Sequence, residues 1–102
     1  MAYYLVQAKP IDELLAELRQ RLVSGEIRVM KPFGQALQYG LENARVQENG
    51  IAIWEEEDYC VPPLAQERAA ILDMYFNELK VERVQQTDGW KRIQSLPKFW
   101  NQ

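Results

Sequence analysis

The stretch IWEEEDYCVPP, from Ile53 to Pro63, decides how this chain folds. Its first two residues and the Ile51-Ala52 pair before them are apolar, as in a strand at the centre of a sheet. Four acidic residues come next, and then two prolines, which suit the first turn of a helix. The stretch therefore predicts a central strand over 51–59 that passes into a helix.

The segments on either side extend this plan. Asn49-Gly50 tolerates positive φ at both positions and predicts a hairpin between 45–48 and 51–54. After Pro62-Pro63, apolar residues at helical spacing predict a third helix, and the alternating KVERVQ at 80–85 predicts the last strand. The buried stripe of that helix is expected to be Leu64, Ile71, Leu72, Tyr75, Phe76 and Leu79.

The N-terminal half supplies one strand and two helices. YYLVQA at 3–8 predicts the first strand, and an apolar stripe over 11–22 predicts a helix that Gly25 caps. Residues 27–30 form a short strand or an extended link. A second helix is expected over 33–44, where two glycines weaken the helix but allow close packing against a neighbour.

At the C-terminal end, the spacing of Trp90, Ile93 and Leu96 suggests a short closing helix. Strands that alternate with helices favour crossover connections and a small sheet covered by helices. We expect an α/β chain in the form of an α+β two-layer sandwich, a single domain over 1–102. Its sheet should have three to four strands with three to four helices packed on it, distantly ferredoxin-like.

Composition and charge exclude several classes of function. The net charge is −3, the pI is about 5.0, and the twelve Lys and Arg residues form no basic run, so no nucleic-acid partner is expected. No apolar run approaches the ~20 residues that span a membrane, so no membrane partner is expected either. With one cysteine no intrachain disulfide can form, which fits a cytoplasmic protein.

The chain contains no histidine. Histidine is the usual general base near neutral pH and the commonest ligand for zinc, copper and iron. Catalysis by Ser-His-Asp or Cys-His groups is therefore excluded. We expect no cofactor and no high-affinity transition-metal site.

The four acids after Trp54 allow several interpretations. On a strand, Glu55 and Glu57 share one face, while Glu56 and Asp58 share the other. We favour a solvated strand end whose charge prevents edge-to-edge aggregation. A patch for a partner, an oxygen-ligated metal ion and glycosidase-like acid–base chemistry are the alternatives.

Basic residues near this strand end suggest a second feature. We expect Lys31, Arg45 or Arg68 to form ion pairs with Glu56 or Asp58, which would make the acidic stretch a structural junction. The same region is the candidate binding site if a small anion binds where two helix N-termini meet. Its residues are Glu56, Asp58, Tyr59, Arg45 and Arg68.

Cys60 and the C-terminal aromatics are the remaining candidates. Cys60 is expected to be a small buried residue; a reactive thiol near a helix N-terminus is the alternative. Trp90, Phe99 and Trp100 should pack back onto the domain, or else form a surface for a protein partner or for self-association.

These observations favour a non-catalytic protein that acts by protein–protein interaction, in a regulatory or assembly role. The alternative is a small-ligand-binding or carboxylate-based enzymatic domain. A closed pocket of roughly 300 Å³ or more lined by Glu56, Asp58, Tyr59 and Arg45 would favour the alternative, and a smooth surface would favour the protein-binding role.

Overall fold

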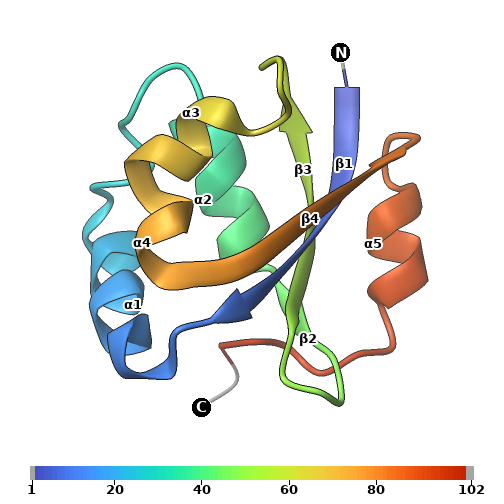
Figure 1. The fold of residues 1–102 in the computed structure, drawn as a ribbon, viewed down its shortest axis with the longest axis horizontal. Helices are drawn as coiled ribbons and strands as arrows, with labels where there is room; N and C mark the ends of the chain where they lie inside the picture. Colours follow the sequence, from blue (N-terminus) through green and yellow to red (C-terminus); the bar gives the residue numbers. More distant parts are fainter. Residues whose placement is uncertain (1, 101–102) are drawn as a thin grey trace.

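The computed structural model describes residues 2–100 and contains a four-stranded antiparallel sheet. The strands lie side by side in the order β2-β3-β1-β4 (Figure 1). Their bounds are β1 (Ala2–Pro10), β2 (Arg45–Val46), β3 (Ala52–Asp58) and β4 (Phe76–Val84). The predicted hairpin at Asn49-Gly50 joins β2 to β3, which is a central strand as expected.

Helices make both crossovers of the sheet. Between β1 and β2 the chain forms η1 (Asp12–Leu14), α1 (Leu15–Ser24) and α2 (Gly34–Glu42). Between β3 and β4 it forms α3 (Ala65–Glu67), the π-helical turn η2 (Arg68–Leu72) and α4 (Asp73–Tyr75). The last helix, α5 (Asp88–Ile93), follows β4. The expected α+β sandwich is confirmed, with a β-α-β-β-α-β order to which α5 is added.

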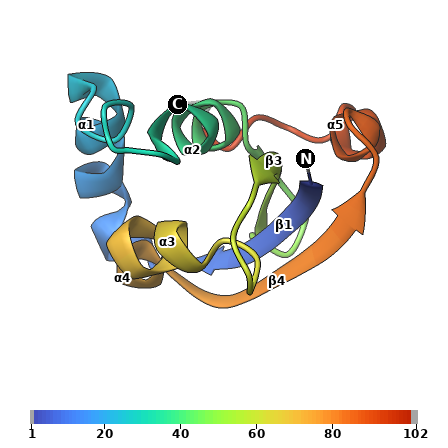
Figure 2. The same ribbon diagram turned by 90° about the horizontal axis from the view of Figure 1, so that it is seen from above.

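The two faces of the sheet are covered unequally. Helices α1 to α4 lie on one side of β1 and β3, and α5 lies on the other (Figures 1 and 2). The larger core, which includes Val6, Leu37 and Trp54, fills the first side. A smaller cluster of Leu5, Ile53 and Ile93 fills the side of α5. Neighbouring residues of β3 therefore belong to different cores.

Two expectations about the chain path are wrong. The third helix ends at Tyr75, and Phe76 begins β4 with extended backbone (φ −136°, ψ 151°). Phe76 pairs with Pro10 of β1, so its burial comes from the sheet and not from a helix face. Residues 27–30 form turns, neither a strand nor an extended link.

Gly40 shows why a weak helix former stands inside α2. A Cβ atom at this position would lie 2.7 Å from Cδ1 of Trp54, too close for a real contact. The glycine therefore allows α2 to approach β3 closely, as the sequence suggested. This close approach brings α2 next to the acidic half of the strand.

The described residues include no helix that is long and apolar enough to cross a membrane.

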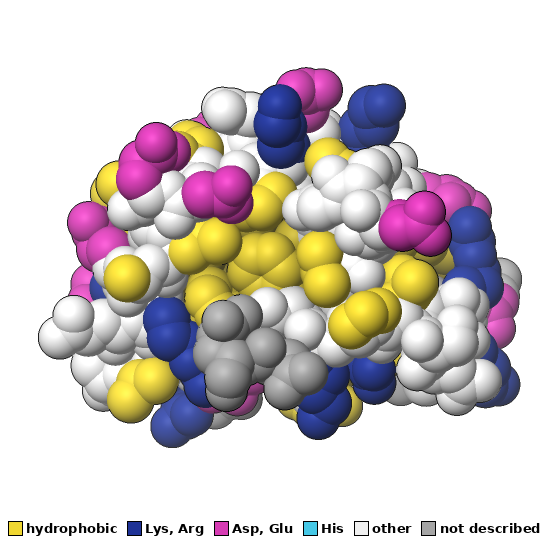
Figure 3. All heavy atoms as spheres, turned by 90° about the horizontal axis from the view of Figure 1, so that it is seen from below, with side chains coloured by type: hydrophobic (Ala, Val, Ile, Leu, Met, Phe, Trp, Pro, Cys, Tyr) yellow, Lys and Arg dark blue, Asp and Glu magenta, His cyan; other side chains and the backbone are white. Residues whose placement is uncertain are grey.

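One face of the molecule has hydrophobic side chains gathered in a central hollow with charged side chains around it (Figure 3).

Candidate functional site

The acidic half of β3 is buried, and the expectation of a solvated strand end is wrong. The side chains alternate between the two faces as predicted, but Glu55, Glu56 and Asp58 are only 4%, 2% and 4% exposed. Helices from both faces extend over this end of the strand. Acidic residues are rarely buried unless they have partners, so the partners of each carboxylate decide what the region does.

Glu55 faces α5 and is fully partnered. Its Oε2 accepts the backbone N–H of Thr87 at 2.9 Å, and its Oε1 accepts that of Trp90 at 3.2 Å. Backbone N–H groups at a helix start have no partners within the helix, and a carboxylate satisfies them well. Glu55 is therefore a structural residue that fixes α5 to the sheet.

Asp58 faces the other side and holds the loop between β3 and α3. Its Oδ2 accepts the backbone N–H groups of Cys60 at 3.1 Å and of Leu64 at 2.6 Å. Leu64 has φ 63°, in the left-handed region that is unfavourable for leucine, so this contact stabilises a strained turn. The turn directs the chain back over β3 and places Glu67 beside Asp58.

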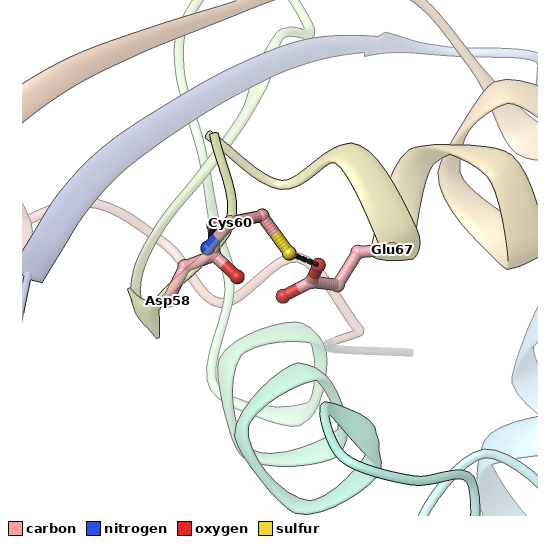
Figure 4. A group of neighbouring side chains, drawn as sticks. All are labelled: Asp58, Cys60 and Glu67. Carbon is pink, nitrogen blue, oxygen red and sulfur yellow. Dashed lines mark hydrogen bonds between the residues drawn. The ribbon is translucent and has the colours of Figure 1, made fainter. Parts of the chain in front are cut away.

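Glu56 and Glu67 form a buried pair of carboxyl groups. Oε1 of Glu56 accepts a hydrogen bond from Nε1 of Trp54 at 3.0 Å. Glu67 is 0% exposed, and its Oε1 lies 4.0 Å from Sγ of Cys60 (Figure 4). The Oε2 atom of each glutamate is buried without a hydrogen-bond donor.

The pKa values of this pair reflect its burial. Burial, and then the contact with Glu67, raises the pKa of Glu56 well above its ordinary value. Burial also raises the pKa of Glu67, to about 7, although the hydrogen bond from Glu56 lowers it. A proton on Glu56 can thus be donated to Glu67, since two adjacent buried carboxylates cannot both be charged cheaply. The pair can share a proton or hold a cation.

The Cys60 thiol lies beside these acids. A backbone hydrogen bond with Gln66 lowers its pKa, but burial and the charges of Asp58 and Glu67 outweigh this and raise the pKa. Cys60 is half-buried, which is less than the sequence suggested. A raised pKa leaves a smaller fraction of the thiol as thiolate, the reactive form, at neutral pH.

These groups form the floor of a pocket of about 960 Å³ that opens to solvent. Its walls come from α2, α3, the loop after β3 and the start of α5. The described lining contains five acids and neither lysine nor arginine. The acids are Glu55, Glu56, Glu57, Asp58 and Glu67, and the aromatic residues are Tyr3, Phe33, Tyr39, Tyr59 and Trp90.

Three of the five predicted binding residues line this pocket: Glu56, Asp58 and Tyr59. Tyr59 is 70% exposed and its hydroxyl donates to Oε2 of Glu57 at 2.7 Å, which raises the pKa of the phenol.

The two predicted arginines lie elsewhere. Nη1 of Arg45 donates to the carbonyl of Leu96 at 2.7 Å, and Nε of Arg68 pairs with Oδ1 of Asp73 at 3.3 Å. The described residues include no ion pair to Glu56 or Asp58, so the expected junction is wrong. The reason is register: Arg45 pairs with Ile53, which lies toward the opposite end of β3.

The C-terminal aromatics are half-buried. Trp90 lines the pocket and stacks edge-on against Tyr39, with ring centroids 6.0 Å apart. Nε1 of Trp100 donates to the carbonyl of Leu41 at 2.7 Å, and Phe99 lies edge-on to Trp100. Both residues pack against the main core, as one of the two expectations proposed.

Glu67 is the site residue that the sequence pattern did not single out. Pro62-Pro63 could have indicated its position, because a turn at these prolines returns the chain toward β3 and so brings Glu67 next to the acidic residues. The aromatic wall formed by Phe33, just before α2, and Tyr39 of α2 was not predicted from the sequence.

Comparison of the chain with protein-family models, with curated proteins and with solved structures finds no match in any of the three, so the function is argued from the site itself.

Proposed function

We propose that this protein binds a small, positively charged ligand in the acidic pocket. The observation that carries the proposal is the charge imbalance of the pocket: its lining has five acids and no basic residue among the described residues, and two buried carboxylate oxygens lack donors. Buried charge is costly unless it is paired, so a cation at the floor would be stabilised by these groups.

The walls of the pocket support the same class of ligand. Aromatic side chains attract cations through the negative faces of their rings, and five of them line the pocket. The pocket exceeds the volume expected of a ligand site and is lined by Glu56, Asp58 and Tyr59, but it opens to solvent and lacks Arg45, so it meets the sequence-based criterion only in part. Arg45 does not line the pocket, which removes the positive charge that an anionic ligand would need.

The protein–protein role that composition favoured has less support. Trp90, Phe99 and Trp100 were its proposed surface, and each is half-buried in packing contacts. Less aromatic area is therefore free for a partner.

A titration with ions of opposite charge tests the proposal. Calorimetry would compare zinc chloride and spermidine with succinate as the anion. At least one of the two cations should bind with 1:1 stoichiometry, and succinate should not. The variant Glu67→Gln should weaken cation binding at least tenfold.

The matched control is Glu13→Gln, which removes the same charge from an exposed position outside the pocket lining. It should change the cation affinity by less than twofold. Absence of binding by both cations, or equal binding of succinate, would contradict the proposed function.

A further inference from the structure

The floor of the pocket brings together three atoms that can each bind a metal ion. One carboxylate oxygen from Asp58, one from Glu67 and Sγ of Cys60 all lie within 4.8 Å of one another (Figure 4). They come from the end of β3, the loop after it and α3. Carboxylate oxygen and thiolate sulfur are both ligands that zinc accepts.

A second, independent observation concerns charge. Apart from the proton that these two carboxyl groups can share, Oε2 of Glu67 and Oε2 of Glu56 have no hydrogen-bond donor, although both side chains are almost completely inaccessible. In Figure 4 the Glu67 carboxyl group points toward Asp58 and Cys60. No lysine or arginine lines the described pocket. The cluster therefore lacks a positive partner at the point where its donor atoms meet.

The surrounding contacts orient these groups. Two backbone N–H groups donate hydrogen bonds to Oδ2 of Asp58, and Nε1 of Trp54 donates one to Oε1 of Glu56. Hydrogen bonds of this kind fix the carboxylates around a metal ion and reduce the cost of organising the site.

We propose that Asp58, Cys60 and Glu67 form an open, exchangeable site for a divalent metal ion of the zinc class, with Glu56 beside it. This inference rests on the proposed function and identifies its positively charged ligand as a metal ion. The Cys60 thiol releases its proton when its sulfur binds the ion. Three protein ligands leave the remaining position to water or to a small molecule in the pocket.

The present distances fit such a site after a small closure. Three donor atoms up to 4.8 Å apart lie no more than about 2.8 Å from a common centre, so zinc–ligand distances of about 2.0–2.3 Å require each to move inward by up to about 0.8 Å. Cys60 lies in the loop between β3 and α3, outside any helix or strand, where such a movement is least costly. Because the site lacks histidine, we expect an exchangeable ion, in keeping with the expectation of no high-affinity transition-metal site.

Cobalt(II) chloride is the probe for the full-length protein, because cobalt bound to a thiolate gives a charge-transfer absorption in the near ultraviolet. The ion-free protein should develop this band with 1:1 stoichiometry, and zinc should remove it by competition. Cys60→Ala should abolish the band, and both Cys60→Ala and Glu67→Gln should weaken zinc binding at least tenfold. Glu13→Gln, at an exposed position outside the pocket lining, should change zinc affinity less than twofold.

A measurement on the unaltered chain guards against variants that do not fold. Bound zinc should slow the alkylation of Cys60 by iodoacetamide at least tenfold, and a chelator should restore the original rate. A cobalt band that persists in Cys60→Ala, or a rate of alkylation that zinc does not change, would overturn the metal site. If spermidine binds and zinc does not, the metal site fails and the proposed function stands. If neither binds, both fail.

Discussion

Glu55 and Glu56 are neighbours on β3 and both are almost fully buried, yet they have different partners. Both oxygens of Glu55 accept backbone N–H groups from the start of α5. Glu56 receives one hydrogen bond from Trp54, and its other oxygen has no donor and lies in a region shared with Glu67. Burial alone therefore does not distinguish the two carboxylates; the groups that each one meets on its own face of the strand do.

The difference follows from what each face of the strand meets. On one face the chain supplies unpaired N–H groups, which match a carboxylate in charge and in hydrogen bonding. On the other face it supplies further acids and a thiol, which do not. A buried group without a partner costs stability, so an arrangement of this kind suggests a ligand that provides the missing charge.

The largest expected effect comes from Trp54, a fully buried residue of the larger core. Trp54→Ala should lower the free energy of unfolding by about 3–5 kcal/mol, because it leaves a large cavity beside Phe76 and removes the donor to Glu56. Denaturant melts would measure the loss. Trp54→Phe keeps much of the ring, and should cost clearly less; an equal cost would assign the effect to the hydrogen bond.

The free energy of unfolding of the Glu67→Gln variant should depend less on pH than that of the unaltered chain. The pKa of Glu67 is raised from 4.5 to about 7, so the folded state binds more protons than the unfolded state in this window. Stability therefore falls as pH rises from about 4.5 to 7 in the ion-free protein. The variant should lose the part of this pH dependence that Glu67 causes. At pH 8 its free energy of unfolding should exceed that of the unaltered chain by on the order of 3 kcal/mol.

Melts of both proteins across this pH range would test that prediction, with Glu56, Asp58 and Cys60 as the titratable groups facing Glu67. Burial also raises the pKa of Glu56, so some of the slope should remain in the variant. A variant that is less stable than the unaltered chain at pH 8 would show that the charge of Glu67 is compensated in the folded state.

Glu55→Ala should destabilise the protein, by about 1–2 kcal/mol, because two N–H groups at the start of α5 lose their acceptor. A solvated side chain, as expected from the sequence, would give a smaller effect. Glu57→Ala is the control: Glu57 is half-buried on the same face and accepts only the Tyr59 hydroxyl among the hydrogen bonds described. It should cost less than about 0.5 kcal/mol. Equal losses would remove the special role of Glu55.

The smallest effect is kinetic and concerns Cys60. In the ion-free native protein its alkylation should be slower than in the unfolded chain, since its thiol is half-buried and its pKa is raised. The rate with iodoacetamide at pH 7.5, with and without denaturant, would measure this. Faster labelling in the native state would indicate a reactive thiol.

The sequence by itself determined the local elements. Alternating and helical spacing located β1, α1, α2 and β3, Asn49-Gly50 located the hairpin, and strand alternation placed Glu55 and Glu56 on opposite faces. The spacing failed at Phe76, where a buried aromatic residue suits a helix stripe and a strand equally well.

The tertiary structure alone decided the state of the acids. A run of four charges predicts exposure, because charged groups are costly to bury. Exposure depends, however, on what packs against the strand, and the contacts that bury Glu55, Glu56 and Asp58 involve residues up to thirty-five positions away. The pairing of Glu56 with Glu67 likewise depends on a turn that Asp58 holds and that no periodicity describes. Periodic patterns report which face of an element is apolar, whereas a site is made where separate elements meet.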